Sequence, residues 1–263
     1  MFMSVQPVIC HAQPGGVTTL TLNQPERRNS LSMTMLAALS EAFTELARDD
    51  ATRVVIVRAE GKVFCAGHDL KEMREHYGQQ EAQERLFHLC SQVMQQIVNL
   101  SKPVIAQVAG VATAAGCQLV ASCDLAVAGA SARFATPGVN IGLFCSTPMV
   151  ALSRNVSRKH AMEMLLTGEL IDATRAEQIG LVNRVVADEE LDATVERLAG
   201  TIAGKSSHTL KIGKAAFYQQ LEMGLADAYE YTARVMTDNL QARDAREGIS
   251  AFLDKRPPHW VDE

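Results

Sequence analysis

The residues best suited to chemistry lie in a stretch made almost wholly of small residues, AGVATAAG at positions 109–116. It follows the apolar run 104–108, which begins after Pro103 as expected for a buried strand, and a helix is expected from about Cys117 to Ser122. Short side chains let a ligand approach the backbone, and the first turn of a helix offers N–H groups without helical partners. Such donors suit a phosphate, a carboxylate or a developing oxyanion. Close packing of the strand against the helix would explain the same small residues without any ligand.

A second small-residue stretch, VFCAGHDLKEM at positions 63–73, also leads into a predicted helix. It carries His68, whose ring titrates near neutral pH and could donate to an acyl group. The alternative is that the ring faces solvent and only the backbone N–H serves. Asp69 is expected to cap the helix that follows.

The six cysteines include no CxxC pair, and no motif of metal-site spacing accompanies them. We therefore expect reduced thiols, no metal site and a cytoplasmic protein. For most of these cysteines, a role as a small buried apolar residue is the expected one. They are Cys10, Cys65, Cys90, Cys117, Cys123 and Cys145.

Composition excludes some classes of function. The net charge is −5 and no long basic run is present, which argues against nucleic-acid binding. No apolar run reaches the length of a membrane-spanning helix. The first residues, from Met1 to Pro7, lack a charged start followed by an apolar block and do not indicate a signal peptide.

The order of the elements predicts an α/β core followed by helices. A strand, a small-residue turn, a helix and another strand form a crossover unit, which favours a parallel sheet. We expect a core over residues 1–200 and a helical region over 201–263, whose apolar face could cover a partner subunit or its own core. Expected strands are 17–22, 53–57, 104–108, 125–128 and 181–186. The first expected helix runs from a cap at Ser30 or Ser32 to Leu46, and further helices are expected over 82–100, 157–166 and 174–179. Residues 188–253 are expected to be helical with breaks near 206–207 and 239–243. Residues 74–81 are expected to form a mobile loop.

Several motifs in order resemble those of the crotonase superfamily, the enoyl-CoA hydratase/isomerase family, from about Val17 to Trp260. They are LNQP at 22–25, NSL at 29–31, FCAGHDLKE at 64–72, KPVIA at 102–106, GCQL at 116–119, CD at 123–124, EG at 247–248 and FLDKR at 252–256. The resemblance implies a ββα spiral core with a C-terminal helical trimerisation region, and trimers or hexamers of the chain. It also implies an acyl-coenzyme A ligand, with coenzyme A as part of the substrate and no permanently bound cofactor.

The resemblance assigns roles to particular residues. Two backbone N–H groups, those of His68 and Ala115, would hold the thioester oxygen as it becomes an enolate. The family usually has glycine where Ala115 stands, and alanine restricts the backbone angles there. Coenzyme A contacts would come from Arg27, Arg28, Ala66, His68, Asp69, Leu70, Lys71 and Ala115, and, from a neighbouring subunit, from Phe252 and Lys255. A solvated surface would explain the charged members as well.

The sequence departs from the family where hydratases carry two glutamates. Those positions hold Gln118 and Gly138, and neither an amide nor a glycine moves a proton. Asn140, Cys145 and Ser146 remain as pocket candidates, although a thiol needs a base or a positive field to become a nucleophile, and none is evident.

We therefore expect an acyl-CoA enzyme of the lyase or isomerase class that stabilises an enolate without glutamate-pair hydration. A malonyl-type acyl-CoA decarboxylase is one alternative, because loss of carbon dioxide generates the enolate without a base. Residual hydration through water and other side chains is a second, and a non-catalytic acyl-CoA-binding or assembly protein is a third.

Overall fold

The computed structural model describes residues 6–263, so most of the stretch examined for a signal peptide, Met1 to Val5, lies outside it. The strands are β1 (Val8–Gln13), β2 (Val17–Leu22), β3 (Val54–Ala59), β4 (Val63–Cys65), β5 (Val104–Val108), β6 (Val111–Thr113), β7 (Leu125–Gly129), β8 (Arg133–Ala135), β9 (Ile171–Asp172) and β10 (Arg184–Val186). The helices are α1 (Met33–Arg48), α2 (Leu70–Glu75), α3 (Gln80–Asn99), α4 (Ala115–Ser122), α5 (Pro148–Asn155), α6 (Arg158–Thr167), α7 (Ala173–Gln178), α8 (Leu191–Ala203), α9 (Ser207–Gln220), α10 (Leu225–Gln241) and α11 (Arg243–Leu253).

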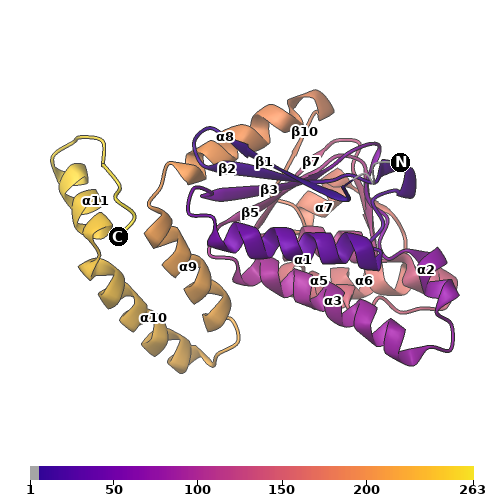
Figure 1. Cartoon of the computed structure of the whole chain (residues 1–263). Helices are drawn as coiled ribbons and strands as arrows, with labels where there is room; N and C mark the ends of the chain where they lie inside the picture. The colour runs from indigo at the N-terminus through magenta and orange to yellow at the C-terminus, as the bar shows by residue number, and fades with distance from the viewer. Residues whose placement is uncertain (1–5) are drawn as a thin grey trace.

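The larger sheet has six strands in the order β1-β2-β3-β5-β7-β10, and only β1 and β2 pair antiparallel. Its central strands are continuous apolar runs because both faces are covered. Helix α8 packs on one face through Leu191, Val195 and Ala199, which join a cluster with strand residues of that face. Helices α1 and α3 cover the other face (Figure 1), and residues of α4 join the same buried cluster. The predicted parallel α/β core is confirmed.

The smaller sheet has the order β4-β6-β8-β9, and along the chain β4, β6 and β8 alternate with β3, β5 and β7 of the larger sheet. Each of β3, β5 and β7 is followed by a three-residue strand that leaves the first sheet and joins the second. The repeating unit is therefore strand, strand and helix or turn, which is the ββα spiral. The prediction described β4 and β6 as loops because three residues are too few to show a periodicity.

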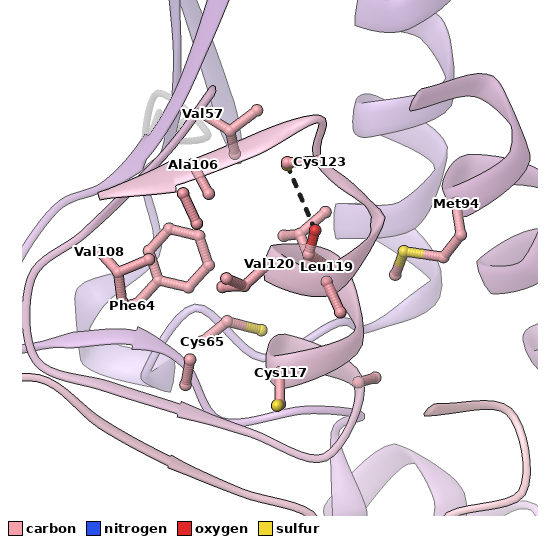
Figure 2. Close-up of a cluster of buried hydrophobic side chains, with 14 of the residues drawn as sticks. Val57, Phe64, Cys65, Met94, Ala106, Val108, Cys117, Leu119, Val120 and Cys123 are labelled. Atoms are coloured by element: carbon pink, nitrogen blue, oxygen red, sulfur yellow. Dashed lines mark hydrogen bonds between the residues drawn. The ribbon is translucent and has the colours of Figure 1, made fainter. Parts of the chain in front are cut away.

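Helix α4 packs against β4 and β6 of the smaller sheet and against α3 and α5, and all eight of its residues are buried. Figure 2 shows Val120 of this helix extending toward Phe64. Cys123, just after the helix, donates from Sγ to the carbonyl of Leu119 at 3.3 Å. The cysteines are free thiols, as predicted.

The last three helices extend away from the core as an arm (Figure 1). The base of the arm is fixed by Lys214 on α9, whose Nζ lies 2.6 Å from Asp124 and 3.0 Å from the carbonyls of Ile97 and Lys102. The end of the chain returns to the core, where Asp262 pairs with Arg53 at 2.5 Å. We call α9, α10 and α11 the C-terminal arm.

Several predicted boundaries were wrong. Strand β1 was missed, and residues 74–81 form the end of α2, a turn and the start of α3 rather than one loop. The last strand begins at Arg184 instead of residue 181, because 181–182 pack as a loop in the core. A further break at 221–224 separates α9 from α10. Ser32, one of two predicted caps of α1, accepts from the N–H of Met35 at 3.2 Å.

Candidate functional site

The carboxyl ends of β4, β6 and β8 meet at one edge of the smaller sheet. Cys65 pairs with Ala112, and Thr113 pairs with Ala135, so the segments that follow these three strands lie side by side. Those segments are 66–68, 114–116 and 136–138. The fold therefore brings the two predicted backbone donors, the N–H groups of His68 and Ala115, close to Gln118 and Gly138, the two positions where the sequence departs from the family.

The 66–68 segment is held from two sides. Its outer contacts run to the 28–31 segment, where the Ala66 N–H donates to the Arg28 carbonyl at 3.1 Å and the Gly67 carbonyl accepts from Leu31 at 2.8 Å. On the inner side, the Thr113 hydroxyl donates to the Ala66 carbonyl at 3.2 Å. These bonds fix the direction of the backbone amide that comes next, at position 68.

Gly67 allows the close approach of the 66–68 and 114–116 segments. Its φ is 89°, which strains any other residue, and a Cβ there would lie 2.9 Å from the Cβ of Ala114 and 3.3 Å from the nitrogen of Ala115. The Ala115 N–H is at the first position of α4, and the His68 N–H follows Gly67. Neither N–H donates a hydrogen bond to any residue that the structure describes. Two unpaired donors thus flank one glycine.

The strained backbone residue is Ala114, whereas the resemblance to the family had pointed to Ala115. Ala115 is an ordinary helical residue, whereas Ala114 has φ 50° and ψ −118°, a conformation that favours glycine. The N–H of Ala114 is fixed to the Ala135 carbonyl at 2.9 Å. Alanine at position 115 therefore leaves the direction of its N–H unaffected.

The His68 side chain turns into the protein rather than toward solvent. Its ring meets the ring of Phe87 edge to face, with centroids 5.2 Å apart, and its Nε2 is sealed with no hydrogen-bond partner in the described chain. Burial lowers the pKa of His68 to about 4. The ring is therefore neutral at physiological pH and is a poor general acid.

Two acidic residues after His68 are already engaged. Asp69 caps α2 by accepting from the N–H groups of Lys71 and Glu72, and it pairs with Arg27 at 2.6 Å. Burial alone would raise the pKa of Asp69, but these hydrogen bonds outweigh it and lower the pKa below its ordinary value. Glu72 accepts from the N–H of Met33 at 3.1 Å. The predicted capping role of Asp69 is confirmed.

The side chain at position 118 is a buried amide whose oxygen has no hydrogen-bond donor among the described residues. Gln118 is 5% exposed, and its Oε1 is sealed without a partner in the described part of the chain. Thr136, at the end of β8, is also buried with an unpartnered hydroxyl. Sequence reasoning missed Thr136, because a single threonine before a proline carries no signal of its own.

Position 138 is closed by the chain that follows it. A Cβ at Gly138 would lie 2.6 Å from the Leu143 carbonyl oxygen and 2.9 Å from the Sγ of Cys145. The Gly138 N–H donates to that sulfur at 3.3 Å, and burial raises the pKa of the Cys145 thiol. A glutamate therefore cannot stand at this position unless residues 143–145 move.

This site can be compared with known proteins. A sequence model of the family described as enoyl-CoA hydratase/isomerase matches residues 12–263. The chain belongs to this family. It is 50% identical over 251 residues to human enoyl-CoA hydratase domain-containing protein 3, mitochondrial, covering 95% of this chain and 82% of that protein. The Xenopus laevis protein of the same name is 48% identical, covering 97% and 86%.

Solved structures of family members share the crotonase fold. A Mycobacterium smegmatis enoyl-CoA hydratase superposes with a TM-score of 0.92 at 52% identity, covering 97% of this chain and 98% of that one. The human enoyl-CoA hydratase domain-containing protein 3 superposes with a TM-score of 0.93 at 50% identity, covering 97% and 100%. The predicted fold class is confirmed.

The prediction of a cytoplasmic location is wrong, because the curated relatives named above are mitochondrial proteins. That prediction relied on reduced cysteines, which indicate a reducing environment without identifying the compartment. Within residues 6–263 no helix is long and apolar enough to cross a membrane.

The remaining site residues predicted from the family lie in varied places. Asn140 donates to the carbonyl of Gly168, at the end of α6, at 3.5 Å, and Ser146 donates to the Phe144 carbonyl of its own loop at 3.4 Å. The predicted coenzyme A contacts that are exposed are Arg27, Arg28, Leu70, Lys71, Phe252 and Lys255. Phe252 and Lys255, at the end of the C-terminal arm, are on a different part of the fold from the paired amides.

A cavity of about 240 Å³ lies where α1, α2 and α3 meet. Met33, Met73 and Leu86 line it, together with Glu72 and His76. Leu86 precedes Phe87, whose ring contacts His68, so the cavity adjoins the site without including either of the two amides.

Proposed function

We propose that the chain is an acyl-CoA enzyme that holds the thioester oxygen between the N–H groups of His68 and Ala115. The observation that carries this proposal is the pair of unpaired backbone donors on either side of Gly67. Fixed dipoles in a buried site stabilise the negative charge of an enolate without reorganising, and each donor is typically worth about 3–4 kcal/mol. The family membership of the chain supports a thioester as the ligand.

The same site lacks the groups for glutamate-pair hydration. Gln118 has an amide where the first carboxylate would act, and Gly138 has no side chain and no room for one. Asp69 is committed to capping α2 and to Arg27. A substrate that loses carbon dioxide would form the enolate here, because breaking the bond between C2 and its carboxylate leaves the electron pair on C2 and requires no base.

Titration of the purified protein with butyryl-CoA, followed by a screen of acyl-CoA thioesters with mass spectrometry, tests this function. We expect butyryl-CoA to bind more tightly than free coenzyme A, and crotonyl-CoA to remain unhydrated. We expect the double change Gln118→Glu and Gly138→Glu to yield no hydratase, because the 143–145 segment occupies the space for the second carboxylate. Rapid hydration by the unchanged protein, or no thioester binding, would contradict the proposal.

We further infer that the chain forms trimers or hexamers through its C-terminal arm. Helix α10 buries none of its residues, and Leu225, Tyr229 and Met236 are 67–76% exposed. Large apolar side chains gathered on one element indicate a protein interface. Light scattering is expected to give three or six copies, and a monomer at micromolar concentration would refute the inference.

A further inference from the structure

The far end of the C-terminal arm has little apolar packing of its own within one chain. Helix α10 buries none of its residues, and in α11 only Asp244 and Ala251 are buried. A helix in a folded protein is normally held by the burial of one apolar face. Contacts other than packing among the arm helices are therefore needed to fix the position of α11.

The last residues of the chain supply such contacts by returning along α11 (Figure 1). The carboxylate of Asp244, which is 1% exposed, accepts from the N–H groups of Val261 at 2.8 Å and Asp262 at 2.9 Å. The N–H of Asp244 donates to the main-chain oxygen of Glu263 at 3.1 Å. Asp244 thus binds three successive residues, and we call residues 260–263 the C-terminal strap.

The other side of the strap is bonded to the junction between α8 and α9. The indole Nε1 of Trp260 donates to the Gly204 carbonyl at 2.9 Å. The carboxylate of Asp262 accepts from the Ser207 N–H at 2.7 Å and pairs with Arg53 at 2.5 Å. The strap therefore joins α11 to this junction and to the start of β3.

The strap also fixes groups at the ends of two helices. Arg53 donates to the carbonyls of Ala203 at 2.8 Å and Lys205 at 2.6 Å, where α8 ends and its last carbonyls lack helical partners. The Asp262 carboxylate lies at the first turn of α9, where a negative charge is favourable. Release of the strap would leave these groups without their partners, which favours the closed arrangement.

Two local features fit the strap to its place. Asp262 has φ 62°, in the left-handed region that aspartate tolerates better than most residues. This turn lets its N–H bind Asp244 while its carboxylate binds Arg53. The ring of Trp260 lies against Gly248 of α11, where an added Cβ would be 3.1 Å from the ring atom Cη2.

We propose that the C-terminal strap holds α11 in the position from which the arm binds another copy of the chain. Phe252 is 82% exposed and Leu253 is 72% exposed on this helix, so the position of α11 decides where their apolar surface lies. The link to binding rests on the assembly proposed above. The first part, that strap bonds hold α11, does not depend on it.

Hydrogen exchange and the fluorescence of Trp260 test the strap in the full-length protein. Trp260 is the only tryptophan in the chain, so quenching of its emission by acrylamide reports the strap alone. Asp244→Ala removes the acceptor of two strap N–H groups, and should increase that quenching and speed amide exchange in α11 by about 10-fold or more. Exchange in β3 and β5 should stay unchanged, because the core opens independently of the arm. Light scattering should show self-association weakened by about 10-fold.

Glu263→Ala is the matched control within the strap. The Glu263 carboxylate pairs with Arg243 at 2.6 Å, but the two side chains are 62% and 70% exposed. Only a surface ion pair is lost, and the bonds to Asp244 remain. We expect exchange in α11 and self-association to stay within about twofold of the unchanged protein.

Several results would overturn the proposal. They are an Asp244→Ala variant in which exchange in α11 and quenching of Trp260 are unchanged, equal acceleration of exchange in β3, β5 and α11, and equal loosening by Glu263→Ala. Self-association that is unaffected when α11 loosens would refute the link to binding. If the unchanged protein is a monomer, the proposed assembly and this link fail, while the exchange and quenching results still decide whether the strap holds α11.

A second variant covers the case in which Asp244→Ala does not fold. Asp262→Asn keeps the shape of the side chain and its tolerance of a positive φ, but removes the charge that pairs with Arg53. It should also speed exchange in α11 and increase quenching of Trp260. No change in either measurement would show that the strap does not hold the helix.

Discussion

The edge of the smaller sheet and the C-terminal arm are opposite kinds of surface. At the sheet edge, α4 buries all eight of its residues, and a Cβ added at Gly116 would lie 2.2 Å from the Cys65 carbonyl. In the arm, α10 buries none of its residues, and Phe252 near the end of α11 is 82% exposed. The sheet edge is complete within one chain, whereas the arm presents apolar surface that one chain does not cover.

This difference indicates that the sheet edge positions the two amides, whereas the arm is suited to assembly with other copies of the chain. Tight packing at the sheet edge holds two amides in place, because bonds and steric contacts on both sides leave the 66–68 segment no freedom. The arm needs no such precision within a chain, and its exposed side chains are suited to binding other copies. Changes at the sheet edge should therefore affect chemistry, and changes in the arm should affect assembly and stability.

The largest effect is expected where the C-terminal arm meets the core, at Lys214. Its side chain is 7% exposed and its Nζ pairs with Asp124 at 2.6 Å. Lys214→Met would leave the partly buried Asp124 without its cation, with only the Val104 N–H and the Tyr218 hydroxyl still donating to it, and should lower the free energy of unfolding by about 3 kcal/mol. Urea denaturation measures this.

The matched control for that change is Arg234→Met within the arm. Arg234 pairs with Glu230 at 3.1 Å, but both side chains are about 70% exposed, so the loss should stay below about 0.5 kcal/mol. If both variants lose the same free energy of unfolding, Lys214 stabilises the contact between the arm and the core no more than an exposed ion pair would.

Gly67→Ala should have the next largest effect, and on catalysis. The new methyl group would collide with Ala114 at 2.9 Å and strain a backbone at φ 89°, so the two amides could no longer converge. Loss of one oxyanion donor lowers kcat about 100- to 1,000-fold, to be measured with the substrate that the thioester screen identifies.

Gly78→Ala controls for backbone strain alone. Gly78 has φ 79° with nothing within 4 Å of its Cβ position. We expect kcat to stay within about twofold of the unchanged protein, and a loss as large as that of Gly67→Ala would remove the argument for paired amides.

Acid should destabilise the sheet edge through His68. Burial lowers its pKa from the ordinary 6.5 to about 4, so protons bind more weakly in the folded state than in the unfolded state. The stability that depends on a neutral His68 ring is fully present above pH 6.5 and is lost as the pH falls toward 4. At pH 5 the free energy of unfolding is lower by about 2 kcal/mol for this reason.

Comparison with His68→Gln isolates this contribution, because glutamine does not titrate. The difference in unfolding free energy between the two proteins, followed by urea denaturation from pH 7.5 to 5, should change by about 2 kcal/mol. A difference that stays constant with pH would mean that the ring is solvated.

The smallest predicted effect distinguishes two neighbouring alanines. Ala114→Gly relieves a positive φ and should raise the free energy of unfolding by about 1 kcal/mol. Ala115→Gly, at a helical position, should lower it by about 0.5–1 kcal/mol. Thermal and chemical denaturation measure both, and two changes of the same sign would contradict the assignment of strain to Ala114.

The sequence predicts the long elements well because each carries its own pattern. Strand β2 has the predicted bounds, and α1 and α3 begin and end within a few residues of their predicted positions. The three-residue strands β4, β6 and β8 escaped prediction because their pairing partners are distant in sequence.

Much of the site could be located in the sequence, but its shape could not. The small residues around Gly67 and Ala115 identify the two segments, and the family resemblance assigns their amides. The closure of Gly138 by Cys145 and the isolation of the Gln118 amide depend on contacts between loops. No local pattern encodes such contacts.

The most direct test of the central claim is the infrared stretch of a ¹³C-labelled thioester carbonyl in bound butyryl-CoA. If the N–H groups of His68 and Ala115 both donate to its oxygen, the stretch falls below its frequency in water, and Gly67→Ala restores much of the difference. An unshifted stretch in the unchanged protein would contradict the account, because the carbonyl would then lie outside the two amides.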